Sequence, residues 1–170
     1  GDNSSRPHLN FLPANAKVNP GDRVVPSGHA GVFPVGLPVG IISSVNCSAT
    51  VASLIVREIE KRAVLEDFPN VDGIVAITHG VGCAVSTVNE GFRMLQRTIW
   101  GHARHPNFGS AMMVGLGCEA NQIPLMVEHF GKPPEGSLHF TTIQHNGGTR
   151  RTIEACLDKL HNEILPLANE

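Results

Sequence analysis

The sequence lacks both a long apolar run and a surplus of charge of one sign. No stretch approaches the roughly 18 apolar residues that a membrane-spanning helix needs, so we expect no membrane span. The net charge of −2 and a pI near 6.5 leave no electrostatic basis for binding nucleic acid. Charged residues are only 16% and apolar residues 41% of the chain, which indicates a folded domain instead of a disordered chain.

The sequence also has few cysteines and shows no signal peptide after Gly1. Its 170 residues predict one domain, or one domain with an appendage. Four cysteines could form two disulfides in a secreted protein, but three of them follow predicted strands instead of framing a small loop-rich scaffold. Reduced thiols and a cytoplasmic location are therefore favoured.

The composition changes near residue 39. Residues 1–39 hold half of the twelve prolines and no helical periodicity, and the alternating stretch 16–25 surrounds a Pro-Gly turn. These features predict a Pro/Gly-rich β-type segment over residues 1–38, followed by an α/β domain over residues 39–170. We expect residues 1–36 to pack loosely on that domain or to order only through another chain.

From residue 40 onward, strand patterns alternate with helix patterns. Three apolar runs read as buried strands and a fourth strand follows, at 38–45, 71–78, 110–116 and 138–143. Strands that alternate with helices imply a parallel sheet. The predicted fold class is α/β, a Rossmann-like three-layer unit with a parallel sheet of about four strands.

Local signals predict where the helices begin and end. Ser48 is expected to cap the first helix, and Thr87 with Glu90 fits a capping box at the second. Pro124 suits the first turn of the third helix and Gly131 its C-terminal cap. The last helix carries an apolar stripe that includes Cys156, Leu157, Leu160 and Ile164, so we expect Cys156 to be a core residue.

Three cysteines each come just after a predicted strand: Cys47, Cys83 and Cys118, at intervals of 36 and 35 residues. The carboxyl ends of parallel strands line one crevice, so this spacing predicts three thiols brought together in space. Each thiol also precedes a helix N-terminus, where a thiolate is easier to form. Three thiolates and a histidine suit iron, an iron–sulfur cluster or zinc. Each cysteine alone could be a small buried residue, but three in register favour a site.

The loops after the four strands hold the other reactive groups. Each loop combines small residues, which let backbone approach a ligand, with thiol, imidazole, amide or carboxylate groups. The loops are residues 46–50 (NCSAT), 78–83 (THGVGC), 115–122 (GLGCEANQ) and 144–149 (QHNGGT). Arg150 and Arg151 stand in the first turn of the last helix, where they oppose the helix dipole, which weakly indicates an anion.

At these loops the chain resembles the altronate/galactarate dehydratase family, which includes the large subunit of sulfolactate sulfo-lyase. The resemblance covers roughly three quarters of the chain and is carried by residues 44–52 (SVNCSATVA), 71–80 (VDGIVAITHG), 104–109 (RHPNFG), 114–122 (VGLGCEANQ) and 147–149 (GGT). It implies a metal-dependent, typically iron-dependent, elimination of water from a sugar acid to a 2-keto-3-deoxy acid. Relative to that family the α/β domain is partial, because a further C-terminal half is expected there.

Residues 1–40 resemble a different family, the rod-shape-determining protein MreC. The similar stretches are residues 1–7 (GDNSSRP) and 18–40 (VNPGDRVVPSGHAGVFPVGLPVG). The chain therefore resembles a junction of two unrelated families near residue 40, which is expected of a chimera or a misjoined gene.

The dehydratase resemblance implies roles for the loop residues. A proton next to a carboxylate is hard to remove until the developing enediolate is stabilised, which a divalent metal can do while a neutral histidine takes the proton. The expected catalytic residues are His79, His145 and Glu119, and the expected metal ligands are Cys47, Cys83, Cys118 and His79. The expected substrate-binding residues are Asn46, Ser48, Thr50, Asn121, Gly147, Gly148, Thr149 and Arg150. An alternative role, holding substrate hydroxyls or supporting the metal ligands, is open to Glu119, Asn46 and Asn121.

Iron is the expected metal, mononuclear or in an iron–sulfur cluster, because it accepts both hard sugar-acid oxygens and thiolates. The expected partner is a small sugar acid, and the sequence leaves open whether the chain forms a homo-oligomer.

Three other functions are alternatives. A nucleotide-binding loop at 115–121 lacks its third glycine, because Asn121 stands there. A nucleophilic Cys83 paired with His79 would leave Cys47 and Cys118 unused. A non-catalytic cell-shape protein would follow the N-terminal resemblance.

Overall fold

The structure, a computed structural model, describes residues 36–169. Its four strands, β1 (Leu37–Ser43), β2 (Val71–Ile77), β3 (Ser110–Gly115) and β4 (Leu138–Thr142), form a parallel sheet in the order β2-β1-β3-β4. The predicted α/β fold with a four-stranded parallel sheet is thereby confirmed. The expected hairpin over 16–25, the rest of the β-type segment before residue 36, and its packing lie outside the described residues.

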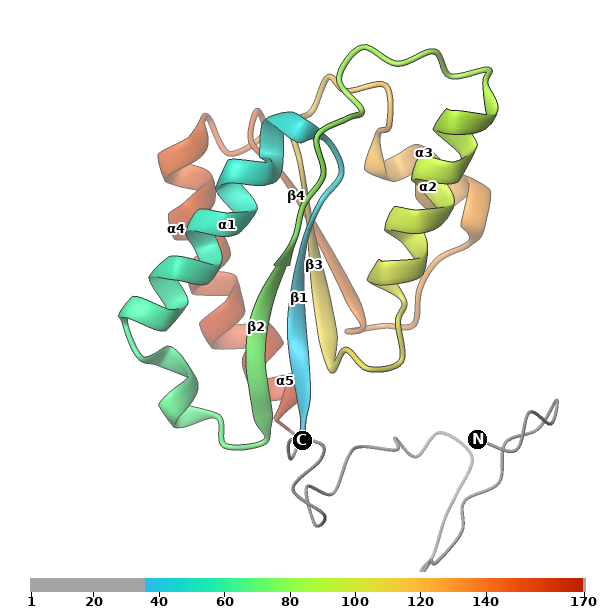
Figure 1. Ribbon diagram of the computed structural model, residues 1–170. Coiled ribbons are helices and arrows are strands. Elements are labelled where there is room, and N and C mark those ends of the chain that lie inside the picture. Colours follow the sequence, from blue (N-terminus) through green and yellow to red (C-terminus); the bar gives the residue numbers. More distant parts are fainter. Residues whose placement is uncertain (1–35, 170) are drawn as a thin grey trace, which may run out of the picture.

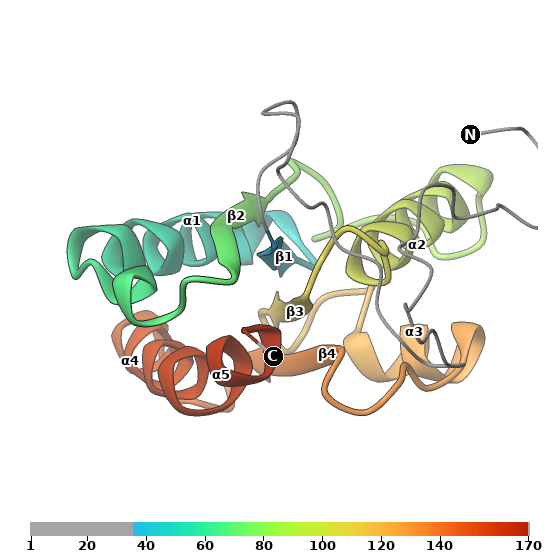
Figure 2. The same ribbon diagram turned by 90° about the horizontal axis from the view of Figure 1, so that it is seen from below.

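Helices cover both faces of the sheet and complete the three layers. On one face lie α1 (Asn46–Lys61) and α4 (Thr149–Lys159), and the opposite face carries α2 (Glu90–Ala103) and α3 (Ile123–Phe130) (Figures 1 and 2). A short 3-10 turn, Val64–Asp67, precedes β2. The last helix is longer than α4 alone, because it continues through a π-helical turn, Leu160–Ile164, into α5 (Leu165–Ala168).

The core lies on the two sides of the central strand β1. Val39 and Ile41 pack against the α1 and α4 side, and Ile42 packs against the α2 and α3 side. Because both faces of β1 are covered, its side chains are nearly continuously apolar instead of alternating. Cys156 lies in the core as expected, and its burial raises the pKa of that thiol to about 11. A structural role for Cys156 therefore fits the fold.

One predicted strand is less buried than expected. The sequence predicted β2 as a buried strand, but β2 is an edge strand in which Val75 is 41% exposed. An edge strand has a neighbour on one side only, and the order of strands cannot be read from an apolar run. The prediction of burial was therefore wrong for β2, while β1 and β3 are buried along almost their whole length.

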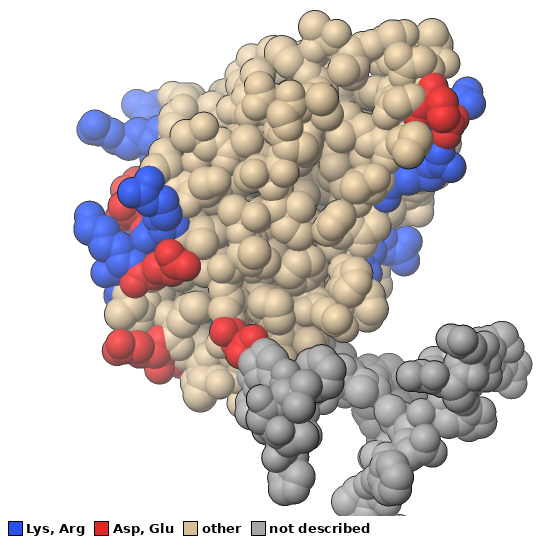
Figure 3. Space-filling model, in the orientation of Figure 1, with Lys and Arg blue, Asp and Glu red and all other residues tan. Residues whose placement is uncertain are grey.

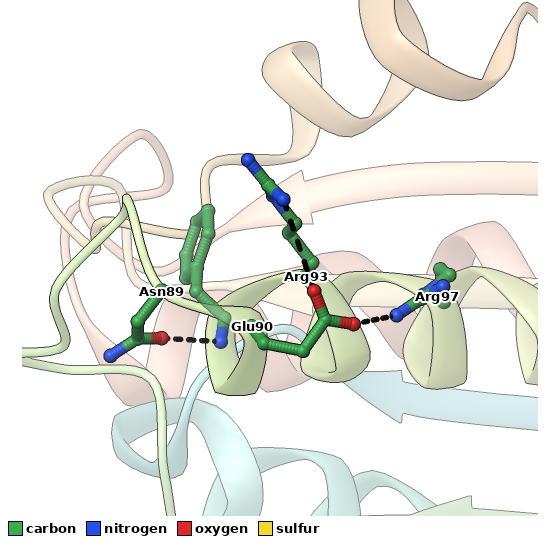
Figure 4. A network of polar contacts seen from close by, with 5 residues as sticks. Asn89, Glu90, Arg93 and Arg97 are labelled. Carbon is green, nitrogen blue, oxygen red and sulfur yellow. Dashed lines mark hydrogen bonds and ion pairs between the residues drawn. The ribbon is translucent and has the colours of Figure 1, made fainter.

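The second helix is capped by a different residue from the one predicted. Asn89 is the N-cap of α2, and its side-chain oxygen accepts a hydrogen bond of 2.8 Å from the backbone N–H of Phe92. Glu90 does not close a capping box with Thr87; its carboxylate instead pairs with Arg93 and Arg97 along the helix (Figure 4). The capping-box prediction was wrong because the helix starts at Glu90, too late for Glu90 to occupy the third position.

The first helix also begins earlier than predicted. The α1 helix starts at Asn46 after Val45, so Ser48 lies inside the first turn and is not its cap. The Ser48 hydroxyl is buried and donates a 2.9 Å hydrogen bond back to the carbonyl of Val45. For the third helix the predictions were correct, because Pro124 stands in the first turn and Gly131 at the C-terminal cap, with φ of 88°.

The surface in Figure 3 separates charged flanks from a neutral middle. In that view most charged side chains of the described residues gather over α1 and α4 at one flank and over α2 at the other, and a further acidic group lies at the lower edge. Within residues 36–169, no helix combines the length and the hydropathy needed to cross a bilayer.

Candidate functional site

The strand order puts the reversal of the sheet between the neighbouring strands β1 and β3. From β1 the chain crosses to β2 at one side, and from β3 it continues to β4 at the other, so the direction of winding reverses between these neighbouring strands. The helix after β1 covers one face and the helix after β3 covers the opposite face, as Figure 1 shows. In open α/β sheets ligands bind at such a reversal, outside the carboxyl ends of the strands.

A buried carboxylate ties these two loops together. Oε1 of Glu119 accepts hydrogen bonds from the Ser44 hydroxyl at 2.7 Å and from the Leu116 N–H at 3.1 Å. Oε2 accepts from the Gly117 N–H at 2.5 Å. Glu119 is only 3% exposed, so both oxygens are committed to the protein. Its evident task is to fix the turn after β3 against the end of β1.

Asn121 belongs to the same buried cluster. Its side-chain N–H donates to the carbonyl of Ser44 at 3.3 Å, while its Oδ1 has no hydrogen-bond partner among the described residues. Gly115 completes the packing, since a Cβ there would lie 2.6 Å from Oε1 of Glu119. Asn121 is fully buried, and its bond to Ser44 ties the loop after β3 to the end of β1.

Two of the three expected thiols are in contact. Cys47, in the first turn of α1, donates a hydrogen bond to the sulfur of Cys83 across 3.7 Å, and both residues are exposed. This hydrogen bond is the main cause of a raised pKa of the Cys47 thiol, followed by burial and by the charges of Cys83 and Cys118. The backbone at the helix start lowers the pKa of Cys47, as expected, but the hydrogen bond to Cys83 outweighs it and favours the protonated form.

The third thiol has a different partner. Cys118 accepts a hydrogen bond of 3.2 Å from the side-chain N–H of Gln144, which comes from the loop after β4. Gln144 also packs over Gly117, where a Cβ would lie 2.7 Å from its Oε1. Cys118 nevertheless lies within electrostatic reach of Cys47, since its charge contributes to the raised pKa there.

His79 follows β2 and is held by backbone groups on both ring nitrogens. Nε2 lies 3.1 Å from the carbonyl of Ser43, and Nδ1 accepts a longer hydrogen bond of 3.4 Å from the N–H of Val81. A carbonyl can only accept, so Nε2 carries the proton and Nδ1 the lone pair. Burial lowers the pKa of His79, against smaller opposing effects of the backbone groups. The neutral ring is the form that can accept a proton or bind a metal.

This pKa shift predicts a dependence of stability on pH. Burial lowers the pKa of both His79 and His139 below the unfolded value near 6.5, so the unfolded chain binds more protons in acid. The free energy of unfolding should therefore be fully developed above about pH 6.5 and should fall as the pH drops below that value through the lowered pKa values of the folded chain. Urea unfolding at several pH values measures this, and His79→Asn should reduce the slope. A free energy that stays level or rises in acid would contradict the assignment.

The remaining expected residues lie around the starts of α1 and α4. Asn46 and Thr50 are exposed on α1, and Gly147, Thr149 and Arg150 are exposed at the start of α4, where Gly148 is the N-cap. Neither helix has a side-chain cap at its N-terminus.

His145 comes directly after Gln144, the hydrogen-bond partner of Cys118. It is exposed on the loop after β4 and borders an apolar hollow between α3 and β4, with Ile123, Val127 and Phe140.

The side chains expected to bind a metal meet only part of the geometry that a metal site requires. A tetrahedral metal with bonds of about 2.3 Å to two thiolates holds the sulfurs about 3.8 Å apart, close to the observed separation of Cys47 and Cys83. Within residues 36–169, however, no three His, Cys, Asp or Glu side chains converge closely enough to hold a metal ion. The pair thus offers two ligands, and any third would require a side chain to move or an external donor.

The sequence analysis assigned no role to two residues of this site. Ser44 donates a hydrogen bond to Glu119, and Gln144 donates one to Cys118. Both stand in the post-strand segments that the pattern picked out. The signal that could have identified them is a polar side chain in the same post-strand segment as the predicted site residues.

Comparisons with known proteins agree with the main resemblance. Residues 38–169 match the family described as D-galactarate dehydratase/altronate hydrolase, second domain. The altronate dehydratase of Escherichia coli (strain K12) is 29% identical over 169 residues, which are 97% of this chain and 32% of that protein. The altronate dehydratase of Bacillus subtilis (strain 168) is 26% identical over 102 residues, 60% of this chain and 19% of that protein.

The N-terminal resemblance is found as well. Residues 1–68 match the barrel core of the rod shape-determining protein MreC, so this match overlaps the dehydratase match over residues 38–68. The cell shape-determining protein MreC of Cereibacter sphaeroides is 56% identical over 43 residues, 25% of this chain and 14% of that protein. The chain spans about a third or less of each of these relatives. No solved structure matches it significantly.

Proposed function

This chain belongs to the D-galactarate dehydratase/altronate hydrolase family, and we propose that it contributes to eliminating water from a sugar acid. The substrate class is an aldonic or aldaric acid such as altronate or galactarate, and the product is a 2-keto-3-deoxy acid. The observation that carries the proposal is the reversal of the sheet between β1 and β3, together with the contact of Cys47 in the segment after β1 with Cys83 in the segment after β2.

We propose that the substrate carboxylate binds where α1 and α4 begin. Neither helix N-terminus has a side-chain cap or an acidic residue in its first turn, so free N–H groups and the positive end of the helix dipole favour an anion. Arg150, exposed in the first turn of α4, adds a cation. Asn46 and Thr50, which are exposed near the start of α1, are proposed to offer hydrogen bonds to substrate hydroxyls.

His79 is the proposed base. Elimination removes the proton from the carbon next to the carboxylate and hydroxide from the neighbouring carbon, and the resulting enol becomes the 2-keto acid. Nδ1 of His79 holds a lone pair restrained only by a long bond to the Val81 N–H, and the lowered pKa keeps it unprotonated near neutral pH. His145, exposed after β4, is the proposed acid for the departing hydroxyl.

Cys47 and Cys83 are the proposed first ligands of a divalent metal, with Cys118 and His79 as the further candidates. Iron suits both thiolates and sugar-acid oxygens, and when bound it would supply the Lewis acidity that stabilises the developing enediolate. Glu119 and Asn121 are proposed to hold the ligand-bearing loops in place, since both are buried and bonded to Ser44 or its neighbours.

A dehydration assay tests the proposal. The chain, purified and loaded with ferrous iron without oxygen, should convert altronate or galactarate to a product lighter by one water, as detected by mass spectrometry. The alditol without a carboxylate should not react. Cys47→Ser with Cys83→Ser should lose the reaction, while Cys156→Ala, which removes a thiol in the core, should keep it. No loss of water from either acid, or full turnover in the double variant, would overturn the proposal.

A further inference from the structure

The contact between Cys47 and Cys83 has a chemical consequence of its own. The two sulfurs lie 3.7 Å apart, and both residues are exposed, although they are 36 residues apart in the sequence. A disulfide bond holds its sulfurs about 2.05 Å apart, so closing the pair requires a movement of less than about 2 Å.

The backbone independently holds these two residues together. The N–H of Asn46, one residue before Cys47, donates a 2.9 Å hydrogen bond to the carbonyl of Val81, two residues before Cys83. Gly82 is buried against the end of β1, where a Cβ would lie 3.4 Å from the carbonyl of Ser44. The approach of the thiols is therefore set by main-chain contacts on both sides, and not by the side-chain rotamers alone.

We propose that Cys47 and Cys83 form an oxidation-sensitive disulfide, closed by exchange with a small disulfide such as oxidised glutathione. Because Cys47 donates its S–H to the sulfur of Cys83, Cys83 is the sulfur that attacks first. As the thiolate it attacks one sulfur of the small disulfide, whose S–S bond breaks and releases one thiolate. Cys47 then gives its proton to solvent and attacks Cys83, which releases the second thiolate. Two protein thiols are oxidised by two electrons, and the small disulfide is reduced to two thiols.

The other two thiols have different surroundings. Cys118 accepts a hydrogen bond from Gln144, and Cys156 is buried in the core. The bond would join the first turn of α1 to the segment between β2 and α2, which contains no helix or strand. The inference goes beyond the proposed function, since it needs neither metal nor substrate.

The test uses the full chain, freed of metal by a chelator and equilibrated with mixtures of reduced and oxidised glutathione. Free thiols are then alkylated, and tryptic peptides are analysed by mass spectrometry. We expect the loss of two alkylated thiols together, a single linked peptide pair that contains Cys47 and Cys83, and full recovery with dithiothreitol. Cys47→Ser should stop at a glutathione adduct on Cys83, and Cys118→Ser should close the disulfide like the parent chain.

Two kinds of result would overturn the proposal. The first is that Cys47 and Cys83 stay free at every ratio of oxidised to reduced glutathione, or carry glutathione without linking. The second is that either thiol links to Cys118 instead. Because dehydration is not measured here, the failure of the proposed function would not alter the outcome, and loss of the disulfide would not by itself refute the dehydratase assignment.

Discussion

Replacing His79 by asparagine should abolish dehydration and leave the fold intact. The asparagine amide has no basic nitrogen to replace Nδ1, and it ends short of the position of Nε2, so the hydrogen bond to the Ser43 carbonyl is lost as well. Loss of a general base costs about 10² to 10⁴ in rate, which is the expected size of the effect. The turnover number and the free energy of unfolding, both measured at about pH 7.5, should separate these effects.

The matched control is His102→Asn, which changes an exposed histidine on the last turn of α2. This variant should retain the parent turnover number. Turnover in His79→Asn equal to that of the parent would end the assignment of His79. Equal losses of stability in both variants would show that histidine removal disturbs the fold generally.

Replacing Glu119 by alanine should cost about 3 kcal/mol or more of folding free energy. The change leaves three donors without their acceptor, namely the Ser44 hydroxyl and the N–H groups of Leu116 and Gly117. A buried donor left unpaired costs about 1–3 kcal/mol, and water entering the space would recover part of that cost. Urea unfolding measures the loss as a lower midpoint with an unchanged slope.

The control for this change is Glu128→Ala, which removes an exposed carboxylate on α3. It should alter the free energy of unfolding by less than about 0.5 kcal/mol. If Glu119→Ala were as mild as the control, the carboxylate would not be holding the turn after β3, and its role would be sought in the crevice.

The fold was largely predictable because the strands are marked by apolar runs. Each observed strand lies within about two residues of its predicted bounds, since the runs are bounded by Gly, Asn and Pro and the helices between them are amphipathic. The order of the strands was not predictable, because pairing of β1 with both β2 and β3 depends on where each helix crosses. For that reason the exposure of Val75 on the edge strand β2 was missed.

The site was predictable in position but not in detail. Spacing alone brought Cys47 and Cys83 to one edge of the sheet, where they touch. Sequence could not show that Cys118 would bond Gln144, or that Ser48 would turn its hydroxyl back to Val45, because both depend on local turns of one or two residues. The N-cap predictions for α1 and α2 failed for the same reason, since a shift of two or three residues in a helix start changes which side chain faces the free N–H groups.

The thiolate absorption of the cobalt-loaded chain tests most directly whether the post-strand thiols form one metal site. Cobalt(II) takes the same sulfur and nitrogen ligands as iron and zinc, and its bonds to thiolates give intense near-ultraviolet charge-transfer bands. We predict one cobalt per chain with these bands, lost in Cys47→Ser with Cys83→Ser, weakened in Cys118→Ser and kept in Cys156→Ala. Cobalt that binds without thiolate bands, or bands that survive in the double variant, would contradict the account.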